Sequence, residues 1–194
     1  MHKLSRDSLM TLEAYARARK EFRAKVIAHK KARTVHLGEH LTLIFEDELT
    51  IRYQVQEMLR IEKIFEEQGI QDEIDAYSAL IPDGRNFKAT LLIEYEDEGE
   101  RRAALARMKG IEDRVWVRVE GCTAVYAIAD EDLERENDVK TSSVHFLRFE
   151  LTREMVESLK YGVGLAMGID HPHYAAKVDR LPDEARTALI RDLA

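Results

Sequence analysis

The feature that most constrains the fold is that the chain switches, over short distances, between two periods of apolar residues. Residues 9–31 repeat apolar side chains at the spacing of an amphipathic helix, and residues 34–45 then alternate apolar and polar side chains around a glycine. The first pattern predicts one long helix, and the second predicts a hairpin in which Val35 pairs with Leu41 across a three-residue loop. Strands joined by so short a loop must be antiparallel.

The rest of the chain continues this mixture of helical and strand periods. We expect further helices over 48–68, 72–80, 99–108 and 152–162 and one that begins at Pro182, with further strands over 88–95, 114–120, 123–129, 143–151 and 163–169. The pattern predicts an α+β fold, in which a mainly antiparallel sheet of about six strands packs with the long N-terminal helix and several shorter helices. No linker or low-complexity segment interrupts the pattern, so residues 1–194 are expected to form a single globular domain.

Composition excludes several classes of function. The formal net charge of -7 makes nucleic-acid binding unlikely as a general property, because neutralising phosphates requires clustered cations. Cys122 is the single cysteine, which excludes an internal disulfide and a multi-thiolate metal site. No apolar stretch approaches the roughly 20 residues of a membrane span, and no export signal is evident, so we expect no membrane and a cytoplasmic protein. Phosphate-loop and dinucleotide motifs are absent, so no nucleotide cofactor is evident.

Three histidines near the C-terminus are the first candidate site. His145 shares the side of its strand with Leu147, and His171 and His173 continue the alternation of residues 163–169. All three imidazoles are therefore expected to point inward. Such a set suits an iron, zinc or manganese ion, although a histidine on an apolar face is also commonly a core residue that is hydrogen-bonded to the backbone.

The second candidate site lies on the helix over 48–68, where polar residues recur every four positions. Arg52, Gln56 and Arg60 form a stripe that can bind a carboxylate or phosphate through forked guanidinium donors. Glu57, beside this stripe, is the candidate catalytic base if the helix packs near the histidines. The alternative is that the stripe is only the solvated side of an amphipathic helix.

Five segments spread over nearly the whole chain resemble a bacterial family known as domain of unknown function 3501: residues 40–46, 54–60, 81–86, 144–150 and 167–172. Genes of this family often lie beside genes for a rubrerythrin-like diiron protein and an iron–sulfur oxidoreductase-like protein. The resemblance therefore implies a role in iron-linked or peroxide-linked redox physiology. It assigns no catalytic residue. It favours metal chemistry or a redox-protein partner.

Three hypotheses follow. The first is an accessory protein that binds a metal or small ligand in iron-linked redox or peroxide-stress physiology. The second is an enzyme that uses a glutamate or histidine as acid/base and an arginine-lined anion site. The third is a non-catalytic interaction protein that docks a rubrerythrin-like or iron–sulfur redox partner or forms a homo-oligomer.

Overall fold

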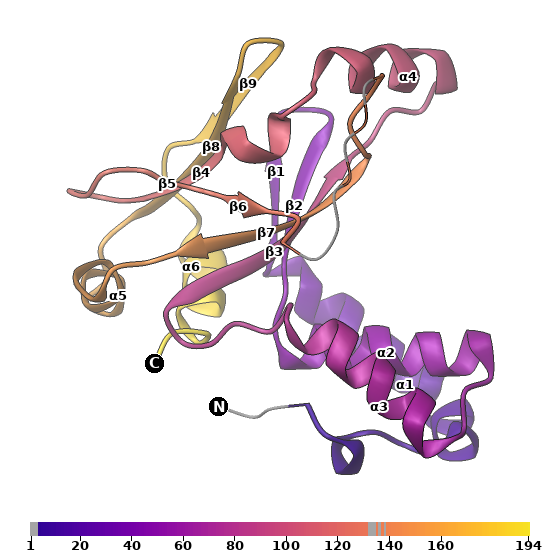
Figure 1. Ribbon diagram of the computed structural model, residues 1–194. Coiled ribbons are helices and arrows are strands. Elements are labelled where there is room, and N and C mark those ends of the chain that lie inside the picture. Colours follow the sequence, from indigo (N-terminus) through magenta and orange to yellow (C-terminus); the bar gives the residue numbers. More distant parts are fainter. Residues whose placement is uncertain (1–3, 132–134, 136, 138) are drawn as a thin grey trace.

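The computed structural model describes residues 4–131, 135, 137 and 139–194 (Figure 1). Within them, helices and strands alternate as the sequence predicts. The helices are η1 (Arg6–Ser8), α1 (Leu12–Lys31), α2 (Glu48–Glu62), α3 (Glu67–Ser78), α4 (Glu98–Arg107), η2 (Ile111–Arg114), α5 (Arg153–Lys160) and α6 (Asp183–Ile190). The strands are β1 (Thr34–Leu37), β2 (Leu41–Phe45), β3 (Asn86–Ile93), β4 (Val115–Val119), β5 (Val125–Tyr126), β6 (Ile128–Ala129), β7 (Val144–Glu150), β8 (Leu165–His171) and β9 (Tyr174–Val178).

The α+β class and the antiparallel pairing are confirmed, but the described strands form two sheets where one of about six strands was expected. One sheet has the order β1-β2-β3-β7-β6, and the other has the order β5-β4-β8-β9. Two features account for the difference. Pro172 and His173 form a tight turn that returns the chain as β9, and the predicted strand over 123–129 bends at Ala127 to join both sheets.

The two sheets are also connected at their edges, so they enclose a common core. On one side, Ala127 lies between β5 and β6, and its backbone amide donates to the carbonyl of Val115 on β4 at 2.8 Å. On the other side, the Tyr174 hydroxyl at the start of β9 donates to the carbonyl of Leu37 on β1 at 2.6 Å. Hydrogen bonds therefore connect the two sheets at both pairs of facing edges.

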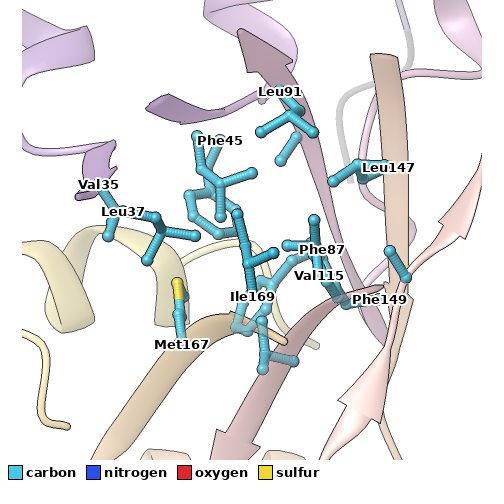
Figure 2. Packing of buried hydrophobic residues seen from close by; sticks show 14 of the residues in the cluster. Val35, Leu37, Phe45, Phe87, Leu91, Val115, Leu147, Phe149, Met167 and Ile169 are labelled. Atoms are coloured by element: carbon cyan, nitrogen blue, oxygen red, sulfur yellow. The ribbon is translucent and has the colours of Figure 1, made fainter. Parts of the chain in front are cut away.

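The main core fills the space between the sheets (Figure 2). Phe45, Phe87 and Phe149 come from three neighbouring strands, and the ring of Phe45 lies 5.9 Å and 6.3 Å from the rings of the other two. Met167 and Ile169 of β8 face them from the second sheet. Burial of these large side chains is the main source of stability for this part of the fold.

A second, smaller core joins the N-terminal segment to α1, α2 and α3, which lie together below the sheets in Figure 1. The Asp47 side chain caps α2 by accepting a hydrogen bond from the backbone amide of Thr50. The helix ends at Glu62, earlier than the expected Gln68, because Lys63 takes a left-handed conformation with φ 56° that stops the helical path. No described helix combines the length and the apolar composition needed to cross a bilayer. That residues 1–194 are one domain stays a prediction.

The register of the first hairpin differs from the expectation. Its loop has three residues, as predicted, but Leu37 pairs with Leu41 and Val35 pairs with Leu43. The loop begins at Gly38, whose φ of 73° favours glycine, so the turn is placed one residue later than the sequence pattern indicated.

Candidate metal site

The candidate site is centred on His145, which points inward from β7. The strand alternates buried and half-buried residues, and His145 has no exposed surface. It pairs with Leu91 of β3 and shares its side of the strand with Leu147. The prediction of an inward-pointing imidazole is therefore confirmed for this histidine.

Oxygen atoms surround both nitrogens of the imidazole ring. Nδ1 lies 2.6 Å from Oδ2 of Asp130. Nε2 lies 3.0 Å from Oγ1 of Thr141, 3.1 Å from the carbonyl oxygen of Ser142 and 3.7 Å from Oε2 of Glu112. A carboxylate at Nδ1 accepts the proton of that nitrogen, so it fixes the ring orientation and leaves Nε2 facing the three other oxygens.

Asp130 is held in place by the backbone around it. The residue follows β6 in a left-handed conformation with φ 48°, which aspartate tolerates better than most residues. Its Oδ1 accepts a hydrogen bond from the backbone amide of Phe146 at 2.9 Å and lies 3.3 Å from a guanidinium nitrogen of Arg135. These contacts leave Oδ2 directed at His145.

Glu112 reaches the site from η2. The turn begins after Gly110, whose φ of 74° allows the chain to reverse there. Glu112 is 8% exposed, and the Thr141 hydroxyl donates to its Oε2 at 3.3 Å. Among the described residues, Glu112, Asp130 and His145 form the group whose possible ligand atoms all lie within 4.8 Å of one another.

His171 and His173 do not belong to this group, so the expectation of a shared three-histidine site is corrected. His171 is buried, but its Nε2 bonds to the carbonyl oxygen of Lys109 at 3.0 Å and its Nδ1 accepts from the amide of His173 at 3.2 Å. His173 is exposed in the turn between β8 and β9. The prediction that His173 points inward is wrong because the alternation of side chains along β8 does not continue through the turn.

The polar stripe on α2 is partly occupied by internal contacts. Gln56 is 1% exposed and binds the backbone of Met10, accepting from its amide at 2.6 Å and donating to its carbonyl at 3.4 Å. Arg52 lies 3.4 Å from Glu48 and over the ring of Phe22. Gln56 is therefore not available to a ligand, whereas Arg52 and Arg60 each keep an Nε without a hydrogen-bond partner in the described structure, so anion binding by these two arginines stays a prediction.

Glu57 is also part of the packing between α1 and α2. Its two carboxylate oxygens each lie 2.8 Å from Arg19, and the Tyr15 hydroxyl donates to Oε1 at 2.5 Å. Arg60 lies 3.3 Å away. The bonds from Arg19 lower the pKa of Glu57 to about 2, with Tyr15 and Arg60 adding to the effect against its partial burial. A carboxylate held ionised in this way is a weak base, and its recorded partners do not include the histidines.

An open acidic cleft lies at the same end of β7 as the candidate site. The cleft has a volume of about 890 Å³, and Ser143, two residues before His145, forms part of its wall. The His40 ring stacks on Tyr95 in this wall at 3.9 Å between centroids. Four carboxylates and the guanidinium of Arg101 also line the cleft, so its lining carries a net negative charge: Glu39, Glu94, Glu96 and Glu100.

Sequence reasoning missed Glu112 and Asp130. Asp130 directly follows the short strand β6, and Glu112 lies in a short turn, so no periodic pattern marks either residue. Only the folding of three separate segments onto one another brings these carboxylates to His145, so no local signal could have identified them.

Comparison with known proteins gives the family and the fold of the chain. The family model for proteins of unknown function, DUF3501, matches residues 3–193. The chain belongs to this family. A crystal structure of a novel protein of unknown function from Burkholderia pseudomallei K96243 is 60% identical, covers 100% of both chains and superimposes with a TM-score of 0.95. No curated protein matches the chain.

Proposed function

We propose that this DUF3501 protein is an accessory metal-binding protein that holds a divalent transition-metal ion between Glu112 and His145, with Asp130 positioning the imidazole. The observation that carries the proposal is the convergence of these three side chains from η2, the end of β6 and β7. An imidazole with neighbouring carboxylates is a donor set suited to zinc, iron or manganese.

The spacing around Nε2 supports an ion at that position. Two donors that bind one ion at about 2.1 Å are separated by about 3.0 Å at right angles and by about 3.4 Å in a tetrahedron. The oxygens of Thr141 and Ser142 lie 3.0 and 3.1 Å from Nε2, close to the right-angle spacing, and Oε2 of Glu112 lies farther away, at 3.7 Å, so it would have to move slightly toward an ion. A carbonyl and a carboxylate oxygen that converge on one ring nitrogen favour a positive centre among them.

Asp130 has a different role in this proposal. Because its carboxylate lies against Nδ1, it orients the ring and makes Nε2 a better electron donor, as carboxylates commonly do behind metal-bound histidines. We therefore assign Glu112 and His145 as direct ligands and Asp130 as the group that positions the imidazole.

A buried network without a metal is the competing interpretation, in which a proton takes the place of the ion. Metal analysis of protein purified without a histidine tag separates the two. We expect about one equivalent of zinc, iron or manganese per chain in the wild type, loss in Glu112→Gln, and weaker retention in Asp130→Asn, since such supporting groups contribute about 10- to 100-fold in affinity.

The exposed His173 supplies a matched control. A His173→Ala variant should retain the wild-type metal content because this side chain lies in the turn outside the group. Wild-type protein that binds no equivalent of these metals at micromolar concentrations, or a Glu112→Gln variant that binds as well as wild type, would contradict the proposal.

We further propose that the bound metal serves iron-linked redox or peroxide-stress physiology in the cytoplasm, with a rubrerythrin-like or iron–sulfur redox protein as partner. The family resemblance motivates this part, and the acidic cleft offers a surface that complements a basic one. Titration of a purified rubrerythrin-like protein, followed by light scattering, tests it. If no complex forms at low ionic strength, a rubrerythrin-like partner is excluded. The same measurement on the protein alone would reveal a homo-oligomer.

A further inference from the structure

A second cavity lies on the opposite side of β7 from the candidate metal site. It has a volume of about 430 Å³ and lies between residues of α2 and α3 and the outer side chains of β3 and β7. Phe146, which follows His145 and points to the other side of the sheet, forms part of the wall. We call this space the α3 cavity and define it by Met58, Glu73, Tyr77, Leu80, Lys88 and Phe146.

Lys88 brings to the α3 cavity a positive charge that has no direct partner, although the carboxylates of Glu131, Asp83 and Glu150 attract it from farther away. Its ammonium group has no hydrogen bond and no ion pair within the described part of the chain. The nearby Glu131 carboxylate is already bound by Arg148, with two contacts of 2.8 Å. Burial lowers the pKa of Lys88, and the charge of Glu131 opposes that effect. Placing an anion beside this ammonium group would therefore offset the cost of its partial burial.

Glu73 brings an unsatisfied acceptor to the same cavity. Its Oε2 is buried and has no hydrogen-bond partner in the described structure. Burial raises the pKa of Glu73, and the charges of Glu62 and Asp72 add to this effect. Buried polar atoms normally have partners, so an acceptor without one in a cavity wall indicates a place for a ligand donor.

The remaining wall is partly apolar and aromatic, and Glu131, Arg135 and Arg148 add charged groups to it. Tyr77 and Leu80 of the α3 region lie on one side, and Phe146 lies on the sheet side. An apolar wall that carries a few separated polar groups is typical of small-molecule sites, whose volumes are roughly 300–1,000 Å³. Lys88 and Glu73 are not paired with each other, so one ligand with two different polar ends can contact both.

We propose that the α3 cavity binds a small organic acid with an apolar body and a hydrogen-bond donor, of the size of an aromatic amino acid or hydroxy acid. The carboxylate pairs with Lys88, and the ammonium or hydroxyl group donates to Glu73. The apolar body packs against Tyr77 and Leu80, because Arg135 already lies over the ring of Phe146. The proposed metal site lies on the other side of the sheet, although Arg135 of the cavity wall also contacts Asp130 at 3.3 Å.

Four related probes test each part of the proposal: L-phenylalanine, 3-phenyllactate, phenylacetate and L-phenylalaninol. Calorimetric titration into the full chain gives the affinities, and NMR of the Lys88 side chain reports contact at the site. We expect L-phenylalanine or 3-phenyllactate to bind most tightly, phenylacetate to bind more weakly because it lacks the donor, and phenylalaninol not to bind because it lacks the carboxylate.

Variants locate the binding. Lys88→Met should weaken binding of the preferred probe by about 10- to 100-fold, the effect of removing a charged hydrogen-bond partner. Glu73→Gln should remove the advantage of the preferred probe over phenylacetate. Lys160→Met, an exposed position on α5, is the matched control and should bind like the wild type.

The proposal is overturned if no acid among the probes binds the wild type at millimolar concentration, or if Lys88→Met binds them as well as the control. Equal binding of phenylalaninol and phenylalanine would also overturn it, because the carboxylate would then play no part. Glu112→Gln should bind the probes normally, so a failure of the metal proposal leaves this result unaffected.

Discussion

Replacing Glu57 by glutamine should destabilise the protein without affecting any site. The carboxylate accepts two 2.8 Å bonds from Arg19 and a hydroxyl bond from Tyr15. A fall of its pKa from 4.5 to about 2 corresponds to about 3 kcal/mol of differential stabilisation. Because the Arg19 side chain is 37% exposed, solvent screening reduces the expected loss to about 2 kcal/mol.

The pH dependence of this loss identifies its origin. The folded-state pKa of Glu57 lies below its ordinary value, so its charge contributes stability that is fully present above about pH 4.5 and is lost as the pH falls toward 2. In urea unfolding, the difference between wild type and Glu57→Gln should be about 2 kcal/mol at pH 7 and less than half of that at pH 3.

Glu21→Gln on α1 is a suitable control, since Glu21 is exposed and its replacement should change the free energy of unfolding by less than about 0.5 kcal/mol. A Glu57→Gln difference below that value at pH 7 would refute the ion-pair account. So would a difference of the same size at both pH values.

Two further substitutions test the packing. Arg33 is 2% exposed and pairs with Asp192, so replacing it by leucine leaves a buried carboxylate without its partner. We expect urea unfolding to show that the free energy of unfolding falls by about 3–5 kcal/mol, and a fall below about 1 kcal/mol would contradict this. Gly168→Ala would place a methyl group against Trp116 and 2.9 Å from the carbonyl oxygen of Ala176. We expect thermal unfolding to show that the free energy of unfolding falls by about 1–3 kcal/mol. An unchanged melting temperature would contradict this, because it would mean that the neighbouring atoms move aside without cost.

Much of the fold could be predicted because hydrophobic period is a local property. Strand alternation placed His145 inside, and the helical spacing of polar and apolar residues placed the start of α2 at residue 48. The prediction failed where the backbone turned without a change in apolar pattern. Pro172 and His173 look like a continuation of β8, yet they form the turn to β9, and Ala127 bends one expected strand into two sheets.

The candidate site was less predictable because its parts are distant in sequence. Glu112 and Asp130 lie near His145 only because the fold places η2 and β6 beside β7. The stripe on α2 shows the opposite error. Glu57 and Gln56 look available in sequence, but α1 and the N-terminal segment cover them and use their hydrogen-bonding groups.

Anomalous diffraction from crystals grown with manganese or zinc tests the proposed metal site most directly. We predict one strong peak within about 2.0–2.2 Å of both Nε2 of His145 and Oε2 of Glu112, and its absence in crystals of Glu112→Gln. A map with no peak beside His145, or with peaks only at exposed groups such as His173, would contradict the account.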